Sequence, residues 1–459
     1  MKSSSSSWDL DQLKRELSKR SEVKGWIITQ ENVRRCERYF MLDGSAFVID
    51  QDRDVQTQTV WAKIFVTSPK AGRQGEITKK LFKTLPLSSQ LDSAISSASD
   101  TDHQAWELPH EHPTTNGLLK TADPKIAEDI NAAAELLTGK ITQLVRQKRP
   151  TVFNSAELFL SIHNRETHMS NGLINRSSQS RVYSEAAYSF SRTLPSGELQ
   201  SDEYLNTCWS VNVDDLRIEE LFANASDYAQ HSLDVVKPQP GKYPVIINAE
   251  VLAELFNGYV SQISAVNSYH GLPFIKPGDE LIRGAHGDLI TLTLDPQLDF
   301  GADTVAISDQ GIAQSRLKLV DKNKVISTAT DQQYSDYLKH SATTSRGNIV
   351  IDPGTLTFEQ LTAQAPKVIE ILQFSGLFAD PNSGTFSSEI RLARLYDNEK
   401  HTVVYLKGGS LSGSIAENFT NARFTNQQVK RAHFASGQMT GQGYFGPSHA
   451  LLNDVSIVG

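Results

Sequence analysis

The sequence predicts an α+β protein of two domains, and three observations support this. The chain has 459 residues, more than one hydrophobic core usually organises. One long helical pattern after residue 123 is followed by strands of alternating polarity, an order typical of an α+β domain rather than a doubly wound one. A polar loop at 237–242 precedes a second half rich in short strand patterns. We expect an N-terminal α+β domain at 8–236 and a mostly antiparallel C-terminal β domain with an early helix at 243–459.

The N-terminal domain begins with a helix and several strands. Residues 1–7 contain five serines and predict a flexible tail without the apolar core of a secretory signal. Apolar residues from Trp8 to Leu17 have the spacing of a short amphipathic helix. The strand patterns that follow lie at 25–29, 38–42, 46–50 and 60–67. Asp43 and Gly44, between the second and third of these patterns, predict a hairpin.

Two polar stretches come next. Residues 70–83 are modestly basic, but Glu76 and apolar residues are mixed in, which favours an amphipathic surface helix over a nucleic-acid patch. Residues 88–121 are rich in Ser, Thr, Asp, His and Pro and predict a loop.

The strongest helical pattern starts at Asp123, whose residue type predicts a helix cap, with Pro124 at the first helical position. Its apolar stripe runs to Leu144, and Pro150 ends it.

Strands are predicted at 152–162 and 180–189, with a type I′ turn at Asn171-Gly172 before the second. A helix is expected at 218–233. In the C-terminal domain we expect a strand at 243–247, a helix at 249–266, and short strands such as 391–396 and 401–406.

Charge and cysteine content exclude several classes of protein. The formal net charge is −8, and no strong cluster of basic residues predicts nucleic-acid binding. No run approaches the roughly 18 apolar residues that span a bilayer, so no membrane partner is predicted. Cys36 and Cys208 are too few and too far apart for a disulfide scaffold. We therefore expect reduced thiols in a cytoplasmic protein.

A search for catalytic motifs finds none from the residues alone. HExxH is absent; His110 and His112 lie between prolines, and His163 and His168 are predicted to point to opposite faces of a strand. There is no GxSxG elbow, and the small-residue run at 408–414 lacks the end of a P-loop, so a tight turn is predicted there. The residues by themselves predict no visible catalytic centre.

Five stretches in order resemble the TldD/PmbA family, once called modulators of DNA gyrase. They are THMSNG at 167–172 with the following strand, YPVII at 243–247 before a helix, SDQG at 308–311, KGGSLSGS at 407–414, and the segment 446–459. The resemblance covers about residues 150–459. It implies a two-domain TldD/PmbA-like architecture.

The resemblance also implies a site. TldD-type members carry HExxxH on the first helix of the C-terminal domain and a later cysteine, which together hold zinc. In this chain Asn257, Gly258 and Gln262 occupy the His, Glu and His positions, and no cysteine follows Cys208. This pattern resembles the TldE/PmbA type, which lacks the ligands and pairs with TldD to degrade or mature flexible peptides. No cofactor is therefore expected in this chain, and zinc is expected in a TldD-like partner.

Three hypotheses follow for the function. The first is a TldE/PmbA-like non-catalytic subunit that forms a heterodimer with a TldD-like protein and helps to process extended or unfolded peptides. The second is a peptide-binding or scaffold protein that self-associates, as a homodimer for example, without proteolysis. The third is a metallopeptidase with a rearranged metal site, for which His270 and His286 are the candidate ligands. Binding to gyrase itself has no support in the charge pattern.

Overall fold

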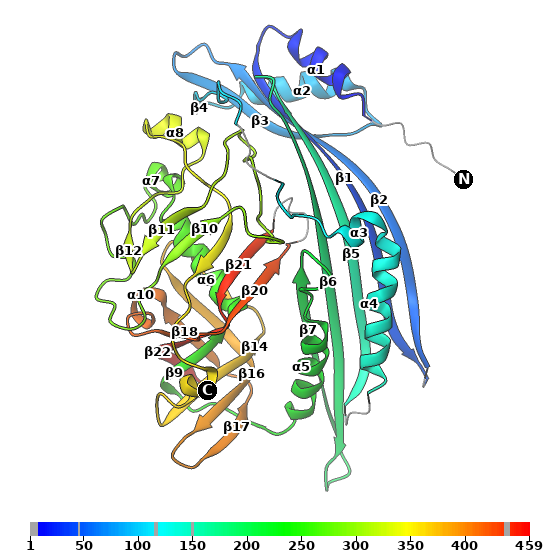
Figure 1. The fold of residues 1–459 in the computed structure, drawn as a ribbon, viewed down its shortest axis with the longest axis vertical. Coiled ribbons are helices and arrows are strands. Elements are labelled where there is room, and N and C mark those ends of the chain that lie inside the picture. Colours follow the sequence, from blue (N-terminus) through cyan, green and yellow to red (C-terminus); the bar gives the residue numbers. More distant parts are fainter. Residues whose placement is uncertain (1–7, 45, 114–117, 148–150, 436–440) are drawn as a thin grey trace.

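The structure is a computed structural model that describes residues 8–44, 46–113, 118–147, 151–435 and 441–459. The tail predicted at 1–7 lies outside these residues. A long curved sheet from the N-terminal half lies beside a β-rich C-terminal half (Figure 1). The α+β fold class predicted from the sequence is confirmed.

Seven strands of the described residues form the long sheet, in the order β4-β3-β2-β1-β5-β6-β7. They are β1 (Val23–Asp43), β2 (Ala46–Thr67), β3 (Arg73–Leu81), β4 (His103–Gln104), β5 (Val152–Met169), β6 (Ile174–Thr193) and β7 (Leu199–Ser210). All neighbouring pairs are antiparallel. The hairpin predicted at Asp43-Gly44 is confirmed, because β1 and β2 pair along almost their whole length.

Helices bury the apolar side chains of this sheet. They are α1 (Leu10–Ser18), α2 (Leu87–Ser99), α3 (Pro124–Glu128), α4 (Ile130–Val145) and α5 (Ile218–His231). Leu13 and Leu91, from the first two helices, join the core that covers β1, β2 and β3. Leu137 and Phe222, from α4 and α5, join the core over β5, β6 and β7. Alternation along the strands therefore directs one set of side chains into these cores and the other set to the opposite face.

Several local predictions for the N-terminal half are wrong. The helix expected within 70–83 is strand β3, and the loop expected at 88–121 contains α2. The long helix after Asp123 breaks into α3 and α4 at Asp129, whose carboxylate caps the second helix by accepting from two backbone N–H groups. The turn at Asn171-Gly172 is present, but only Gly172 has a positive φ, 93°, so it is not type I′.

The C-terminal half adds two sheets to the described structure, of six and nine strands. The six strands are β10 (Leu292–Asp295), β11 (Leu317–Asp321), β12 (Lys324–Val325), β13 (Asn348–Ile351), β20 (Gln428–His433) and β21 (Gln442–Pro447). The nine are β8 (Val235–Val236), β9 (Gly241–Asn248), β14 (Lys367–Phe374), β15 (Phe378–Ala379), β16 (Thr385–Asp397), β17 (Thr402–Leu406), β18 (Ser410–Ser414), β19 (Arg423–Phe424) and β22 (His449–Val458). Most pairs are antiparallel, as predicted.

Five strands of the larger sheet close into a ring. β14 pairs with β9, β9 with β22, β22 with β18, β18 with β16, and β16 again with β14. The remaining helices are α6 (Ala249–Gln262), α7 (Ala265–His270), α8 (Gln332–Leu338), α9 (Phe358–Thr362) and α10 (Ile415–Asn418). The helix predicted at 249–266 therefore ends earlier, and Ser264 caps a separate short helix. Helix α6 packs between the two sheets.

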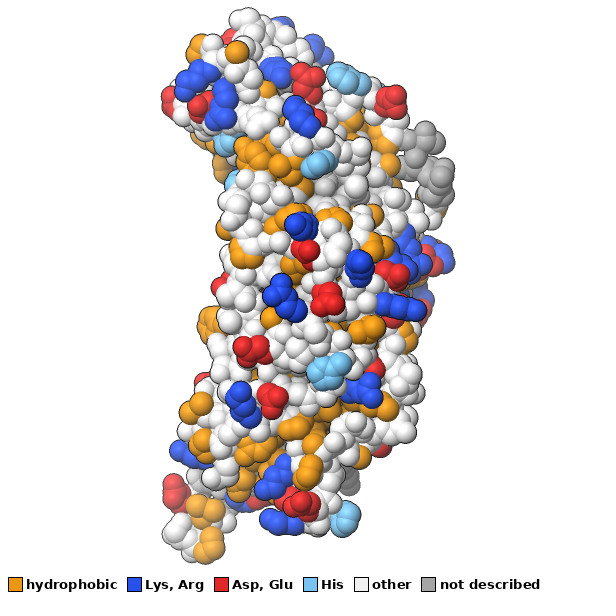
Figure 2. All heavy atoms as spheres, turned by 90° about the vertical axis from the view of Figure 1, so that its left-hand side faces the viewer, with side chains coloured by type: hydrophobic (Ala, Val, Ile, Leu, Met, Phe, Trp, Pro, Cys, Tyr) orange, Lys and Arg blue, Asp and Glu red, His pale blue; other side chains and the backbone are white. Residues whose placement is uncertain are grey.

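Polar contacts join the two halves. The Tyr204 hydroxyl on β7 donates to the Arg391 carbonyl at 2.6 Å. Arg346 lies 2.5 Å from Asp303 and 3.2 Å from Asp309, and Asp309 lies 4.0 Å from Arg165 on β5. On the face of the C-terminal half turned to the viewer in Figure 2, charges of both signs are interspersed. No helix of the described chain has the length and apolar character needed to cross a membrane.

Candidate functional site

Helix α6 carries Asn257, Gly258 and Gln262, the three positions that the family resemblance identified. Asn248 caps it by accepting from the Val251 N–H at 3.1 Å, and a buried apolar stripe holds it in the core. Along this helix Asn257 is exposed, Gly258 is half-buried, and Gln262 is only 8% exposed. The three positions therefore differ in environment, and Gln262 faces the protein interior.

The turn between β15 and β16 lies directly against this part of α6. The Gln262 Nε2 donates to the Pro381 carbonyl at 2.5 Å and reaches the Asn382 carbonyl at 3.4 Å. A Cβ added to Gly258 would lie 3.5 Å from the Pro381 Cα. The Asp380 carboxylate accepts from Ser383 Oγ at 2.7 Å, and this hydrogen bond lowers the pKa of Asp380. A well-bonded turn thus occupies the space beside the motif positions.

These residues do not fit a zinc ion. Amide side chains are poor zinc ligands beside imidazole and thiolate, and glycine supplies neither a ligand nor a base. The Gln262 amide already donates a hydrogen bond to the Pro381 carbonyl. Within the described ranges, no three His, Cys, Asp or Glu side chains come close enough together to hold a metal. We therefore derive no metal chemistry at this helix.

The two alternative histidines lie in different surroundings. His270 ends α7, where its Nε2 is 2.9 Å from the Tyr334 hydroxyl and its ring packs against Tyr269. His286 lies in an exposed loop, with Nδ1 3.2 Å from the Gly284 carbonyl. The hydrogen bonds recorded for these imidazoles go to a hydroxyl and a carbonyl, and the described structure does not bring the two together in a ligand cluster.

Other histidines singled out in the sequence also have structural partners. His112 Nε2 lies 3.1 Å from the Asn171 carbonyl, and His168 Nε2 lies 2.9 Å from Glu166. His163 contacts Glu31 at 3.3 Å, and burial lowers the pKa of His163. The run at 408–414 forms the predicted tight turn, since Gly408 and Gly409 both have positive φ before β18 begins.

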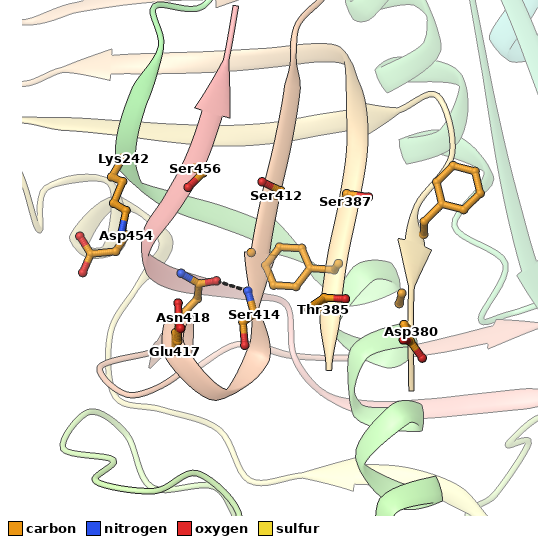
Figure 3. Close-up of a pocket in the computed structure, with 14 residues that line it drawn as sticks. Lys242, Asp380, Thr385, Ser387, Ser412, Ser414, Glu417, Asn418, Asp454 and Ser456 are labelled. Carbon is orange, nitrogen blue, oxygen red and sulfur yellow. Dashed lines mark hydrogen bonds between the residues drawn. The ribbon is translucent and has the colours of Figure 1, made fainter. Parts of the chain in front are cut away.

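A shallow hollow of about 580 Å³ lies beside the Asp380 turn (Figure 3). Ser387, Ser412 and Ser456 lie in register across three strands of its floor. Phe378 and Phe386 line the hollow beside these serines, so its surface is partly apolar. No histidine is among the described residues that line it, so its serines lack the neighbouring base that nucleophilic catalysis requires.

A deeper cleft of about 420 Å³ separates β7 and α5 from the C-terminal half. Its walls include Trp209 from β7, Tyr228 from α5, Gln373 and Phe374 from β14, and His433 from β20. Clefts of this size at domain boundaries are the usual place for ligands. Sequence reasoning did not find this cleft, because residues far apart in the chain form it.

Burial shifts the pKa values of several titratable groups in the cleft. Burial lowers the pKa of His449 to about 4 and raises the pKa of the Cys208 thiol to about 12. Burial also raises the pKa of Glu370, which accepts from the Tyr396 hydroxyl at 2.7 Å. A protonated thiol is a poor nucleophile, so Cys208 is not suited to covalent catalysis.

The buried His449 predicts a specific loss of stability in acid. Its pKa falls from 6.5 to about 4 in the folded state. Below pH 6.5 the unfolded chain therefore binds a proton that the folded chain does not, and stability is lost as the pH falls toward 4. His449→Gln should reduce the difference in free energy of unfolding between pH 7 and pH 4.5 by about 2 kcal/mol.

Urea unfolding at both pH values measures this difference in the free energy of unfolding. His401→Gln, at an exposed position, is the control. An unchanged difference in the His449→Gln protein would contradict the assignment.

The chain is similar to known proteins in sequence and in fold. Residues 240–459 match the family model of the PmbA/TldA metallopeptidase C-terminal domain. A search of curated proteins gives no match. The fold is similar to the crystal structure of a modulator of DNA gyrase from Bacteroides thetaiotaomicron VPI-5482, with 16% identity, 98% of both chains covered and a TM-score of 0.75.

Two further solved structures have a similar fold. TldE from Thermococcus kodakarensis is 16% identical, with 98% of this chain and 100% of that chain covered at a TM-score of 0.75. A gyrase modulator from Thermotoga maritima MSB8 is 16% identical over the same shares, with a TM-score of 0.73. The C-terminal half of this chain thus belongs to the TldD/PmbA family, and the whole chain has the fold of that family's TldE-type and gyrase-modulator structures.

Proposed function

We propose that this chain is a non-catalytic, TldE-like subunit of a TldD-type metallopeptidase that processes flexible peptides in the cytoplasm. The observation that carries the proposal is the contact between α6 and the β15–β16 turn. At the motif positions Gln262 bonds the Pro381 carbonyl, and the same turn lies over Gly258. An amide and a glycine in these places supply neither metal ligands nor a general base.

The partner would supply the metal and the activated water, and this chain would supply walls for the peptide. The fold similarity to a structure named TldE supports the subunit role. The cleft between the halves supports a share in peptide binding, because its lining combines aromatic and polar side chains and its Cys208 thiol is not an activated nucleophile. A TldD-type chain, rather than a second copy of this chain, is then the partner that completes the enzyme.

Elemental analysis tests the proposal. The chain is purified alone and after co-expression with a TldD-type protein from the same genome. We expect background zinc in the lone chain, and about one zinc per heterodimer, as for a catalytic site. Stoichiometric zinc in the lone chain, lost in His270→Ala or His286→Ala, would overturn the proposal in favour of a rearranged metal site. A stable homo-oligomer that binds peptides and ignores the TldD-type protein would overturn it in favour of a scaffold.

A further inference from the structure

A single row of side chains crosses five strands in the floor of the shallow hollow (Figure 3). Phe378 on β15 pairs with Ser387 on β16, and Ser387 pairs with Ser412 on β18. Ser412 pairs with Ser456 on β22, and Ser456 pairs with Lys242 on β9. Residues in register across paired strands point to the same face of a sheet. The row therefore presents an aromatic ring, three hydroxyls and an ammonium group over about 19 Å, since neighbouring strands lie about 4.8 Å apart.

The aromatic end of the row is exposed and held in place. Phe378 is 77% exposed, although it is a large apolar residue among polar neighbours. The turn that follows it is closed by the Asp380 N–H, which donates to the Thr385 carbonyl at 2.9 Å, and by the Gly384 N–H, which donates to the Asp380 carbonyl at 2.9 Å. An exposed apolar group with a polar rim is typical of a binding surface. Because the turn fixes the backbone beside Phe378, little order has to be gained when a ligand covers the ring.

The hydroxyls in the middle of the row have no protein partner. Ser387 and Ser412 are exposed and Ser456 is half-buried, and the described structure records no hydrogen bond for these three hydroxyls. The neighbouring Ser388 points to the other face of β16, where its hydroxyl donates to the Gly376 carbonyl at 2.6 Å. A serine hydroxyl can donate one hydrogen bond and accept two. The row thus offers a line of donors and acceptors to a ligand, on a floor kept low by small side chains.

The charged groups around the hollow disfavour an anionic ligand. The described residues that line it include three carboxylates, those of Asp380, Glu417 and Asp454, and one cation, Lys242. Asp454 has a φ of 54° and lies at a bulge in β22, an irregularity that is common next to functional sites. Phosphates and other anions meet a net negative charge here, whereas neutral hydroxyl groups can donate to these carboxylates.

We propose that the hollow binds a neutral oligosaccharide whose sugar rings lie across the strands along this row. One sugar ring packs its C–H face on Phe378, and the following rings direct their hydroxyls to the serines and to the carboxylates of the rim. At this row β16, β18 and β22 each pair with a strand on both sides, so no sheet edge is open and recognition depends on side chains. This binding activity goes beyond the proposed subunit role and does not depend on it.

Titration calorimetry of the full-length chain tests the site with four tetrasaccharides. Three are neutral, namely maltotetraose, cellotetraose and tetra-N-acetylchitotetraose, and the fourth is tetragalacturonic acid. We expect at least one neutral sugar to bind with a dissociation constant of about 1 mM or lower, and the acidic sugar to bind at least tenfold more weakly than that one. No binding of any neutral sugar at about 10 mM would overturn the inference. Equal binding of the acidic sugar would also overturn it.

Variants of the two ends of the interaction identify the site. Phe378→Ala should weaken binding of the best sugar at least tenfold, whereas Phe378→Trp keeps a stacking surface and should bind within about twofold of the wild type or more tightly. Ser412→Val raises the floor with a residue that strands accept, so it should also weaken binding at least tenfold. Phe82→Ala is the matched control, because Phe82 is 49% exposed and does not line the hollow. Each variant is first checked for an unchanged melting temperature.

Wild-type affinity in both Phe378→Ala and Ser412→Val would overturn the inference. The other possible occupant of the hollow is a protein surface. If no sugar binds and Phe378→Ala instead prevents association with the TldD-type protein, the hollow is part of a protein interface and the inference is wrong. The proposed function is decided separately by zinc content and by association of the wild-type chain with the TldD-type protein. Sugar binding by a lone chain that holds stoichiometric zinc would therefore overturn the proposed function and leave the saccharide site in place.

Discussion

Replacing Arg346 with alanine should lower the free energy of unfolding by about 3–5 kcal/mol, because it leaves a buried carboxylate without its cation. The Arg346 guanidinium lies 2.5 Å from Asp303 and also bonds Asp309 at 3.2 Å. The Asp303 side chain is only 14% exposed, and its other recorded hydrogen bond comes from the Gly347 N–H at 2.9 Å. Burial raises the pKa of Asp303, and the Arg346 charge opposes that shift. Urea unfolding at pH 7 measures the effect.

Two controls identify the cause. Arg316→Ala removes an arginine that is 64% exposed and 3.6 Å from Asp295, so it should change stability by less than about 1 kcal/mol. Adding Asp303→Asn to Arg346→Ala removes the orphaned charge and should restore part of the loss. The explanation fails if Arg346→Ala costs no more than Arg316→Ala, or if the second substitution restores nothing.

Replacing Phe256 with alanine should cost about 3–5 kcal/mol, because it opens a cavity in the core that holds α6. The Phe256 side chain is fully buried, with 0% exposure. Its ring lies 5.9 Å from that of Phe419 and 6.4 Å from that of Phe424. These neighbours belong to other parts of the C-terminal half, so the helix is fixed from several directions and has little freedom to collapse into the cavity.

Thermal and urea unfolding measure this second effect. Phe82→Ala is the matched control, because Phe82 is 49% exposed and its truncation opens no core cavity. If the two substitutions cost the same, the interior around α6 is not close-packed and the rigid placement of the motif positions is wrong.

The sequence predicts where strands occur better than it predicts how long they are. Patterns at 25–29 and 38–42 are two ends of the single strand β1, which spans Val23–Asp43. Its middle contains Glu31, which pairs across the sheet with Arg165 and contacts His163 at 3.3 Å. Charged residues that pair across neighbouring strands have the same polar sequence pattern as a loop. Their pairing exists only when the sheet has formed.

Helix α2 was missed for a different reason. Leu91, Ala94, Ile95 and Ala98 have helical spacing and are all buried, but serines around them suggest a loop. The helix lies so close to β3 that a Cβ on Gly75 would be 2.0 Å from the Ala98 carbonyl oxygen. Tertiary packing therefore fixes a helix whose own sequence is a weak helix former.

The candidate site was found in part. The resemblance identified Asn257, Gly258 and Gln262, but nothing in the sequence indicates that Pro381 packs on them, because that contact crosses 119 positions. Gln373 lies in a run of strand-like residues, and the pattern does not show the bulge that turns it toward β7. Sequence patterns report periodicity, whereas a site depends on where that periodicity is broken.

The closed ring of five strands has a consequence for the way the C-terminal half forms. β22 pairs with β9 and β18, and its first residue, His449, pairs with Asn248 at the end of β9. The two strands are separated by nearly the whole C-terminal half, so this half has a high contact order and should fold slowly. Until β22 arrives, β9 and β18 each expose an open edge, which is prone to pair with other chains. A newly made chain is therefore most dependent on chaperones in the interval before its last strand is inserted.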